Sequence, residues 1–188
     1  MSEFPPAGTK VITRGFREVC EVDGRTFFRK KGSQEWIEDK SNPDDLKPPV
    51  ENPHLYLYLV QWEARPAEPN HWAIFLADEN EPDFGYVYKV VGDATHMRYQ
   101  PSAEKVNVAE IGVTASVYTL AVVTDGQARV AELVRQAAEE EPPPRAENRA
   151  AVKENCQGWA VRVIARLVKK KVVMPQKLEL VRSLLEEV

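Results

Sequence analysis

The chain has few of the residues and patterns that mark several large classes of protein. Its 188 residues include only two cysteines, Cys20 and Cys156, and three histidines. So few cysteines, with no C-x-x-C pair, argue against a secreted disulfide framework and against a zinc site of the usual spacing. The sequence has no glycine-rich phosphate loop, and no apolar run approaches the roughly 18 to 20 residues of a membrane-spanning helix. We therefore expect no cofactor, no bound metal and no association with a membrane.

An excess of positive charge is also absent. The 25 lysines and arginines stand against 29 aspartates and glutamates, for a formal net charge of −4. This balance argues against nucleic acid as a partner. The first ten residues, "MSEFPPAGTK", lack the apolar segment of a secretory signal. We expect a cytoplasmic protein whose thiols are reduced.

What the sequence does contain indicates one compact domain with a short N-terminal extension. Hydrophobic residues make up 43% of the chain, a typical value for a globular protein. In residues 1–53 we expect a leader, a β-hairpin with its turn at Asp23-Gly24, and a proline-rich connection over residues 39–53. Residues 54–188 would form the core.

The core is expected to begin with strands and to end with helices. Three apolar runs, starting at His54, His71 and Phe84, have strand length, and the loops between them are too short for crossover helices. They are therefore predicted to be antiparallel neighbours, and residues 115–123 are either a further strand or the approach to a helix. Helical spacing starts at Gln127, again after Asn155, and after Pro175, with an exposed linker over 139–149. This order indicates an α+β fold, an antiparallel sheet packed against C-terminal helices.

Cys156 lies at the start of the second predicted helix. It is one turn before Ala160, on the same apolar stripe as Val163 and Ile164, so it faces the sheet. A helix N-terminus presents free backbone N–H groups and the positive end of the helix dipole, which lower the pKa of a thiol and can hold an oxyanion. Cys156 is therefore either a nucleophile or a buried packing residue, since free cysteine is often buried.

A cysteine nucleophile needs a base, and His71 is the best placed of the three histidines. It opens the strand "HWAIFLAD", at an edge that could meet the helix N-terminus. His54 and His96 are more easily surface residues. The alternative is that His71 is a structural residue at a strand end. Asn155, directly before the cysteine, is predicted to cap the helix, and Gln157 either faces the cleft or is exposed in the first turn.

The pair "NHWAIFLAD" and "ENCQGW", 85 residues apart from His71 to Cys156, resembles the circularly permuted papain-like cysteine enzymes. These include the lecithin:retinol acyltransferase-like proteins and the PPPDE (desumoylating isopeptidase-like) peptidases. Fungal proteins of similar size with H-W and N-C-Q-x-W motifs also look similar. The resemblance covers roughly residues 55–172. It implies a circularly permuted papain-like core with His71 as general base and Cys156 as nucleophile.

The resemblance also implies a third polar group that orients the imidazole from the strand after the histidine. In this chain that position holds Lys89 or Tyr88. Lysine cannot accept a hydrogen bond from the imidazole as a carboxylate would. Three other residues are possible replacements: His96, Asp93 and Gln61.

Two hypotheses about function follow. The first is a thiol-dependent acyl-transfer enzyme: a cysteine peptidase, isopeptidase or amidase acting on a protein, a peptide or a small amide or ester, or else an acyltransferase. Hydrolysis is favoured because acyltransferases of the retinol type usually carry a membrane anchor. The second is a non-catalytic module of the same fold that binds a peptide or a small molecule.

Overall fold

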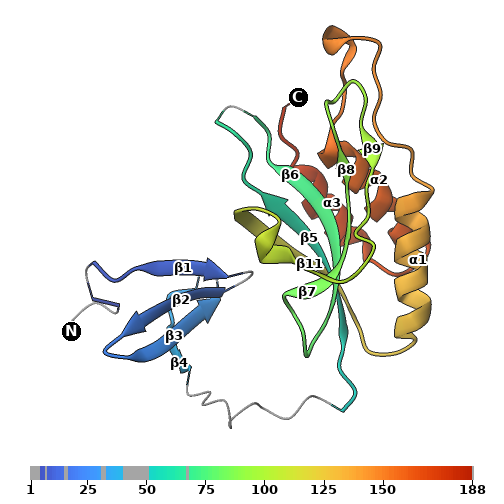
Figure 1. Cartoon of the computed structure of the whole chain (residues 1–188). Helices are drawn as coiled ribbons and strands as arrows, with labels where there is room; N and C mark the ends of the chain where they lie inside the picture. The colour runs from blue at the N-terminus through green and yellow to red at the C-terminus, as the bar shows by residue number, and fades with distance from the viewer. Residues whose placement is uncertain are drawn as a thin grey trace.

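The computed structural model describes residues 5–6, 8–14, 17–30, 33–39, 51–66 and 68–187. The fold is mixed α+β, with antiparallel sheets followed by C-terminal helices, as predicted (Figure 1). The described strands pair into a four-stranded, a five-stranded and a two-stranded sheet.

The four-stranded sheet is N-terminal and consists of β1 (Val11–Arg14), β2 (Arg17–Val22), β3 (Arg25–Lys30) and β4 (Ile37–Asp39), in that order. The predicted hairpin is confirmed, because β2 pairs with β3 through a turn in which Asp23 (φ 52°) and Gly24 (φ 73°) both have positive φ. Two-residue hairpin turns of this kind suit the twist of the strands, and glycine adopts them without strain. Most of the predicted connection, residues 40–50, lies outside the described residues.

The five-stranded sheet has the order β10 (Val106–Asn107), β7 (Phe84–Tyr88), β6 (His71–Asp78), β5 (Leu55–Trp62) and β11 (Thr114–Val123). All its pairs are antiparallel, so the three predicted strands and their arrangement are confirmed. Residues 115–123 are in a strand, not an approach to a helix. The third predicted strand is interrupted at Lys89, after which β8 (Val90–Val91) pairs with β9 (Arg98–Tyr99).

Three α-helices follow, and they lie together on one side of the five-stranded sheet (Figure 1). They are α1 (Gln127–Glu139), α2 (Cys156–Lys169) and α3 (Pro175–Ser183); short 3₁₀ helices η1 and η2 occupy Val108–Glu110 and Arg149–Ala151. Pro175 stands in the first turn of α3, as predicted. The central helix α2 contacts β6, α1 and α3, so it is the element around which the core is built.

The two faces of β6 belong to different packing clusters. Trp72, Ile74 and Leu76 pack with the helices, including the predicted α2 stripe, whereas Ala73 and Phe75 pack on the opposite face with residues of β5, β7 and η1. Successive side chains of a strand point to opposite faces of the sheet. A strand that is covered on both faces therefore has a continuous run of apolar residues in its sequence. Burying a large apolar side chain such as Trp72 stabilises the fold by about 1.5 to 3 kcal/mol.

Two predictions about the C-terminal half are wrong in part. Residues 140–148 are not simply an exposed linker, because Glu141 and Pro144 are buried and the chain pairs with the loop after β8 at His96 and Arg145. The final helix is also shorter than the helical spacing of apolar residues after Pro175 suggested. It ends at Ser183, and Leu185 beyond it is 46% exposed.

Candidate functional site

The candidate site lies where the N-terminus of α2 meets the start of β6. Asn155 caps the helix as predicted: its Oδ1 accepts a hydrogen bond of 2.8 Å from the backbone N–H of Gln157. Cys156 is therefore the first residue of the helix, and its position on the buried stripe places it in the core beneath the sheet, with 5% of its surface exposed. Both described cysteines are free thiols.

The backbone N–H groups of Trp72, Cys156 and Gln157 are near the Cys156 sulfur and act to lower the pKa of the thiol. Burial nevertheless has the largest effect and raises the pKa of this thiol above its usual value, and the nearby Glu186 carboxylate raises it further. The expectation that the helix N-terminus would leave this thiol with a lowered pKa is therefore wrong for this conformation. The thiol is neutral at neutral pH, although the donors that would stabilise a thiolate are in place.

His71 opens β6, and its side chain lies on the face of Ala73 and Phe75, opposite the face on which Trp72 packs with Cys156. Its ring stacks on Trp62 of β5, with the ring centroids 5.9 Å apart and the planes at 16°. Burial, together with the positive charge of Lys89, lowers the pKa of His71 to about 4. The imidazole is thus neutral at neutral pH, and in the described part of the chain no hydrogen bond joins it to Cys156.

Lys89, rather than Tyr88, is the group that accompanies His71. Its Nζ lies 5.6 Å from the centroid of the Trp62 ring, so lysine, tryptophan and histidine form one cluster. Tyr88 packs with the helices on the other face. A lysine cannot accept a hydrogen bond from the imidazole N–H, so this cluster supplies a positive charge and no acceptor.

The other candidate orienting residues lie elsewhere. His96 is exposed, with its Nδ1 3.0 Å from the hydroxyl of Thr95, and Asp93 accepts hydrogen bonds from Thr95 and from Arg149. Gln61 is 6% exposed and pairs across the strands with Trp72 rather than with His71. None of the three has a contact with the His71 ring among the described residues.

Gln157 is fully buried, which excludes the exposed first-turn position considered above. Its Nε2 donates hydrogen bonds of 2.9 Å to the backbone carbonyl of Asn70 and 2.7 Å to the carboxylate of Glu186. Its Oε1 accepts a 2.9 Å bond from the backbone N–H of Glu186. The side chain thus ties the N-terminus of α2 to the start of β6 and to the segment after α3.

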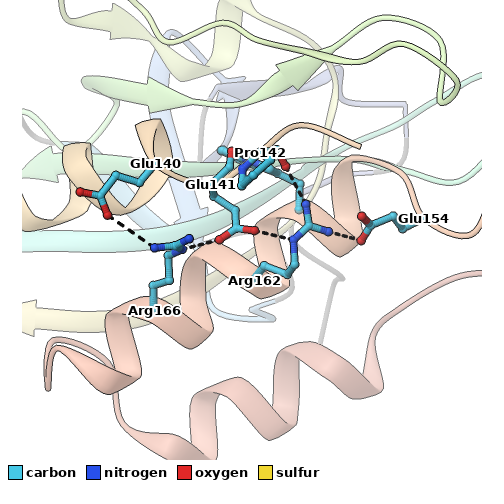
Figure 2. A network of polar contacts seen from close by, with 7 residues as sticks. Glu140, Glu141, Pro142, Glu154, Arg162 and Arg166 are labelled. Atoms are coloured by element: carbon cyan, nitrogen blue, oxygen red, sulfur yellow. Dashed lines mark hydrogen bonds and ion pairs between the residues drawn. The ribbon is translucent and has the colours of Figure 1, made fainter. Parts of the chain in front are cut away.

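The loop that leads into Cys156 is held against α2 by a network of ion pairs and hydrogen bonds between side chains (Figure 2). Arg162 donates to Glu141 (Nε to Oε1, 2.6 Å), to Glu154 and to the carbonyl of Pro142, and Arg166 donates to the second oxygen of Glu141. Burial alone would raise the pKa of Glu141, but the hydrogen bonds from the two arginines outweigh it, so the pKa is lowered. The network holds the chain on both sides of the Asn155–Cys156 turn.

Two of these residues gave no signal in the sequence. Glu186 follows the last helix in a stretch that looks like an ordinary polar end, and its partner at Asn70 is a backbone group. Glu141 sits between other acids and three prolines, and only the fold distinguishes it from Glu140. The one indication of further residues at the site was Gln157, directly after the cysteine, because the side-chain amide of a buried glutamine requires hydrogen-bond partners.

Within the described residues, no group of three His, Cys, Asp or Glu side chains is arranged to hold a metal ion. The described helices include none with the length and apolar character needed to cross a membrane.

Together, the fold and this site define a mixed α+β protein in which a buried cysteine opens the central helix against an antiparallel sheet. The chain belongs to a family of unknown function, DUF6540, whose model matches residues 57–174, more than half of the chain. The match includes His71, Lys89 and Cys156 but ends before α3 and Glu186. No curated protein and no solved structure matches the chain.

Proposed function

We propose that this protein is a thiol-dependent acyl-transfer enzyme with Cys156 as its nucleophile, most readily a hydrolase of amide or isopeptide bonds. The observation that carries the proposal is the position of Cys156 as the first residue of α2, where backbone N–H groups are near its sulfur. Such donors stabilise negative charge on sulfur, or on an oxyanion that forms beside it.

The chemistry would proceed through a thioester. The Cys156 sulfur attacks the substrate carbonyl, and the thiol proton passes to His71. The tetrahedral intermediate then expels the amine, which takes the proton from His71, and a thioester to Cys156 remains. Water adds to the thioester, with His71 removing its proton, and the carboxylic acid leaves as the thiol is restored. If an amine or alcohol replaced water, the same steps would give an acyltransferase.

His71 is proposed as the base because it stands at the first position of β6, next to Trp72 of the Cys156 cluster, although its ring lies on the opposite face of the strand and must turn around the strand end to reach the sulfur. A pKa of about 4 means that its ring is unprotonated at neutral pH but is a weak base in its buried position, so the proposal requires the pKa of His71 to rise towards neutral when the ring moves to the sulfur. The thiol and the imidazole would both rest in their neutral forms, and the proton would move when substrate is attacked. The imidazole must leave its stack on Trp62 to do this.

The circularly permuted papain-like core implied by the sequence motifs belongs to the same proposal. The order of a strand that opens with histidine before a helix that opens with cysteine supports it. A protein or peptide substrate, or a small amide or ester, in the cytoplasm is the corresponding expectation for partner and location.

A second candidate is a non-catalytic binding module. It is favoured by one specific observation, that Lys89 occupies the place where an acceptor for the His71 N–H would be expected. With a neutral thiol and an unoriented imidazole, the site would bind a peptide without attacking it.

The experiment that separates the two is covalent trapping in the Cys20→Ser background, where Cys156 is the remaining cysteine. Peptides with an electrophilic vinyl sulfone, and activated acyl esters, would be incubated with the protein and with its His71→Ala variant. We expect a mass shift on Cys156 and a thioester that hydroxylamine removes. We expect adduct formation to fall by about 10²- to 10⁴-fold in His71→Ala, the usual contribution of a general base.

The control is iodoacetamide, a small electrophile that needs no bound substrate. If iodoacetamide modifies Cys156 equally in both proteins and no acyl or peptide probe reacts, the enzyme proposal fails. Retained binding of a peptide in that case would favour the binding module.

A further inference from the structure

The residues that follow α3 return to the candidate site and make specific contacts there. The Glu186 carboxylate accepts hydrogen bonds through Oε1 from the backbone N–H of Asn70 (3.1 Å) and from Nε2 of Gln157 (2.7 Å). The backbone N–H of Glu186 donates to Oε1 of Gln157 (2.9 Å). One residue therefore engages the site through both its side chain and its main chain.

These contacts have the form of ligand recognition rather than of ordinary surface packing. Gln157 is fully buried, and both its amide oxygen and its amide nitrogen are bonded, the nitrogen also to the carbonyl of Asn70. A buried amide must find such partners, because leaving it without them is costly. Yet the partner here, Glu186, is exposed. The hydrogen bonds of the buried Gln157 amide are thus completed by Glu186 at the surface, and a residue of another chain can take the place of Glu186.

The receptor formed by Gln157 and the Asn70 backbone binds two groups, a peptide N–H and a carboxylate. Gln157 supplies an acceptor for the first, and Gln157 and the Asn70 N–H supply two neutral donors for the second. The receptor lies directly beside the nucleophile, because Gln157 follows Cys156 in the first turn of α2. The Glu186 carboxylate is close enough to raise the pKa of the Cys156 thiol.

We propose that Gln157 and the Asn70 backbone form a subsite for an acidic residue of a peptide chain, and that residues 184–187 fill this subsite and shield Cys156. The inference rests on the proposed function, since it names the class of substrate for that site, an acidic peptide. The segment must be displaced before such a peptide reaches the thiol. Leu184 and Leu185, which lie between α3 and Glu186, would move with it.

The test measures alkylation of Cys156 by iodoacetamide at a fixed, mildly alkaline pH, in the full chain with Cys20→Ser. The variants are Glu186→Ala and Glu186→Gln, and the matched control is Glu187→Ala, the adjacent exposed acid, which has no hydrogen bond or ion pair within the described part of the chain. We expect alkylation to become faster by about tenfold in Glu186→Ala, the change that a loss of about 1.4 kcal/mol of docking free energy produces. Glu186→Gln should lie between, and Glu187→Ala should match the parent.

A second arm tests the subsite with a ligand added in trans. A capped synthetic peptide with the sequence of residues 183–187, at millimolar concentration, should slow alkylation of the Glu186→Ala variant towards the parent rate. The same peptide with glutamine in place of its residue 186 should protect much less. Equal protection by both peptides, or by neither, would overturn the acidic subsite.

The outcomes of this test are independent of catalysis. If Glu186→Ala and Glu187→Ala alkylate at the parent rate, the segment does not shield the thiol, whatever the enzyme assays show. If the segment and the peptide behave as expected but no acyl adduct ever forms on Cys156, the subsite stands and the proposed acyl transfer fails.

Discussion

At the residue scale, two titrating groups have pKa values that burial moves away from those of a reactive pair. Burial raises the pKa of the Cys156 thiol and lowers that of the His71 imidazole to about 4. A thiolate–imidazolium pair needs the opposite directions. The site is therefore built for neutral groups at rest, and any ion pair must await a change in their surroundings, such as the departure of Glu186.

The position of Lys89 leads to a prediction about His71. Because desolvation has the largest effect and Lys89 adds to it, Lys89→Met should raise the pKa of His71 above about 4 but leave it below 6.5. An NMR titration of the imidazole carbons would measure it. Lys105→Met, which removes a lysine paired with Glu81 instead, serves as the control. An unmoved His71 titration in Lys89→Met would show that desolvation acts alone.

The sign of the linked stability change follows from the same values. Between about pH 4 and 6.5 the unfolded chain binds a proton at residue 71 that the folded chain does not bind. This residue therefore makes the protein less stable as the pH falls through that window and has no further effect below it. In Lys89→Met the pKa of His71 in the folded chain should be higher, so the pH range over which this residue lowers the stability should be narrower. Urea titrations at several pH values would detect the difference.

At the element scale, much of the fold could be predicted because periodicity reports burial. The α2 stripe of Ala160, Val163, Ile164 and Leu167 is fully buried, and the apolar run of β6 marks a strand covered on both faces. The loop before α2 could not be read in this way. "EEEPPP" has no periodicity, and the burial of Glu141 depends on two arginines that lie 21 and 25 residues later in the chain. Likewise, helical spacing continued past Ser183, where the chain in fact turns to Gln157.

The Glu141 network yields a prediction for that loop (Figure 2). Glu141→Gln keeps the shape but removes the charge that both arginines bind, and we expect a loss of about 1 to 3 kcal/mol in the free energy of unfolding. The pKa of Glu141 is lowered, so its contribution is complete above its ordinary pKa of 4.5 and disappears as the pH falls through the folded value. Urea unfolding of the variant and the parent should therefore differ at neutral pH and converge in acid.

Glu140→Gln is the matched control for this experiment. Glu140 is the neighbouring acid, but its carboxylate is 57% exposed and lies 3.5 Å from Arg166. Exposed pairs of this kind contribute about 0 to 1 kcal/mol. Equal effects of the two substitutions would mean that burial of Glu141 adds nothing to its ion pairs.

At the scale of the whole molecule, the two cysteines lie in different parts of the fold. Cys20 lies in β2 of the N-terminal sheet, and Cys156 lies under the five-stranded sheet. The family match starts at Leu57 and so leaves the N-terminal sheet outside it. In the N-terminal part the sequence predicted the hairpin from its Asp23-Gly24 turn, whereas in the larger part it also predicted the buried faces from the spacing of apolar residues.

The two thiols give a prediction about how the molecule unfolds. The N-terminal sheet leaves Val11, Ile12 and Ile37 at least 40% exposed, whereas Cys156 is surrounded by the fully buried side chains of β6 and α2. A small sheet with little apolar burial is only marginally stable. In a urea titration with brief alkylation pulses and mass spectrometry, Cys20 should therefore become modified at lower urea than Cys156. Coincident midpoints would instead indicate that the two sheets unfold as one cooperative unit, with the N-terminal sheet stabilised by the core.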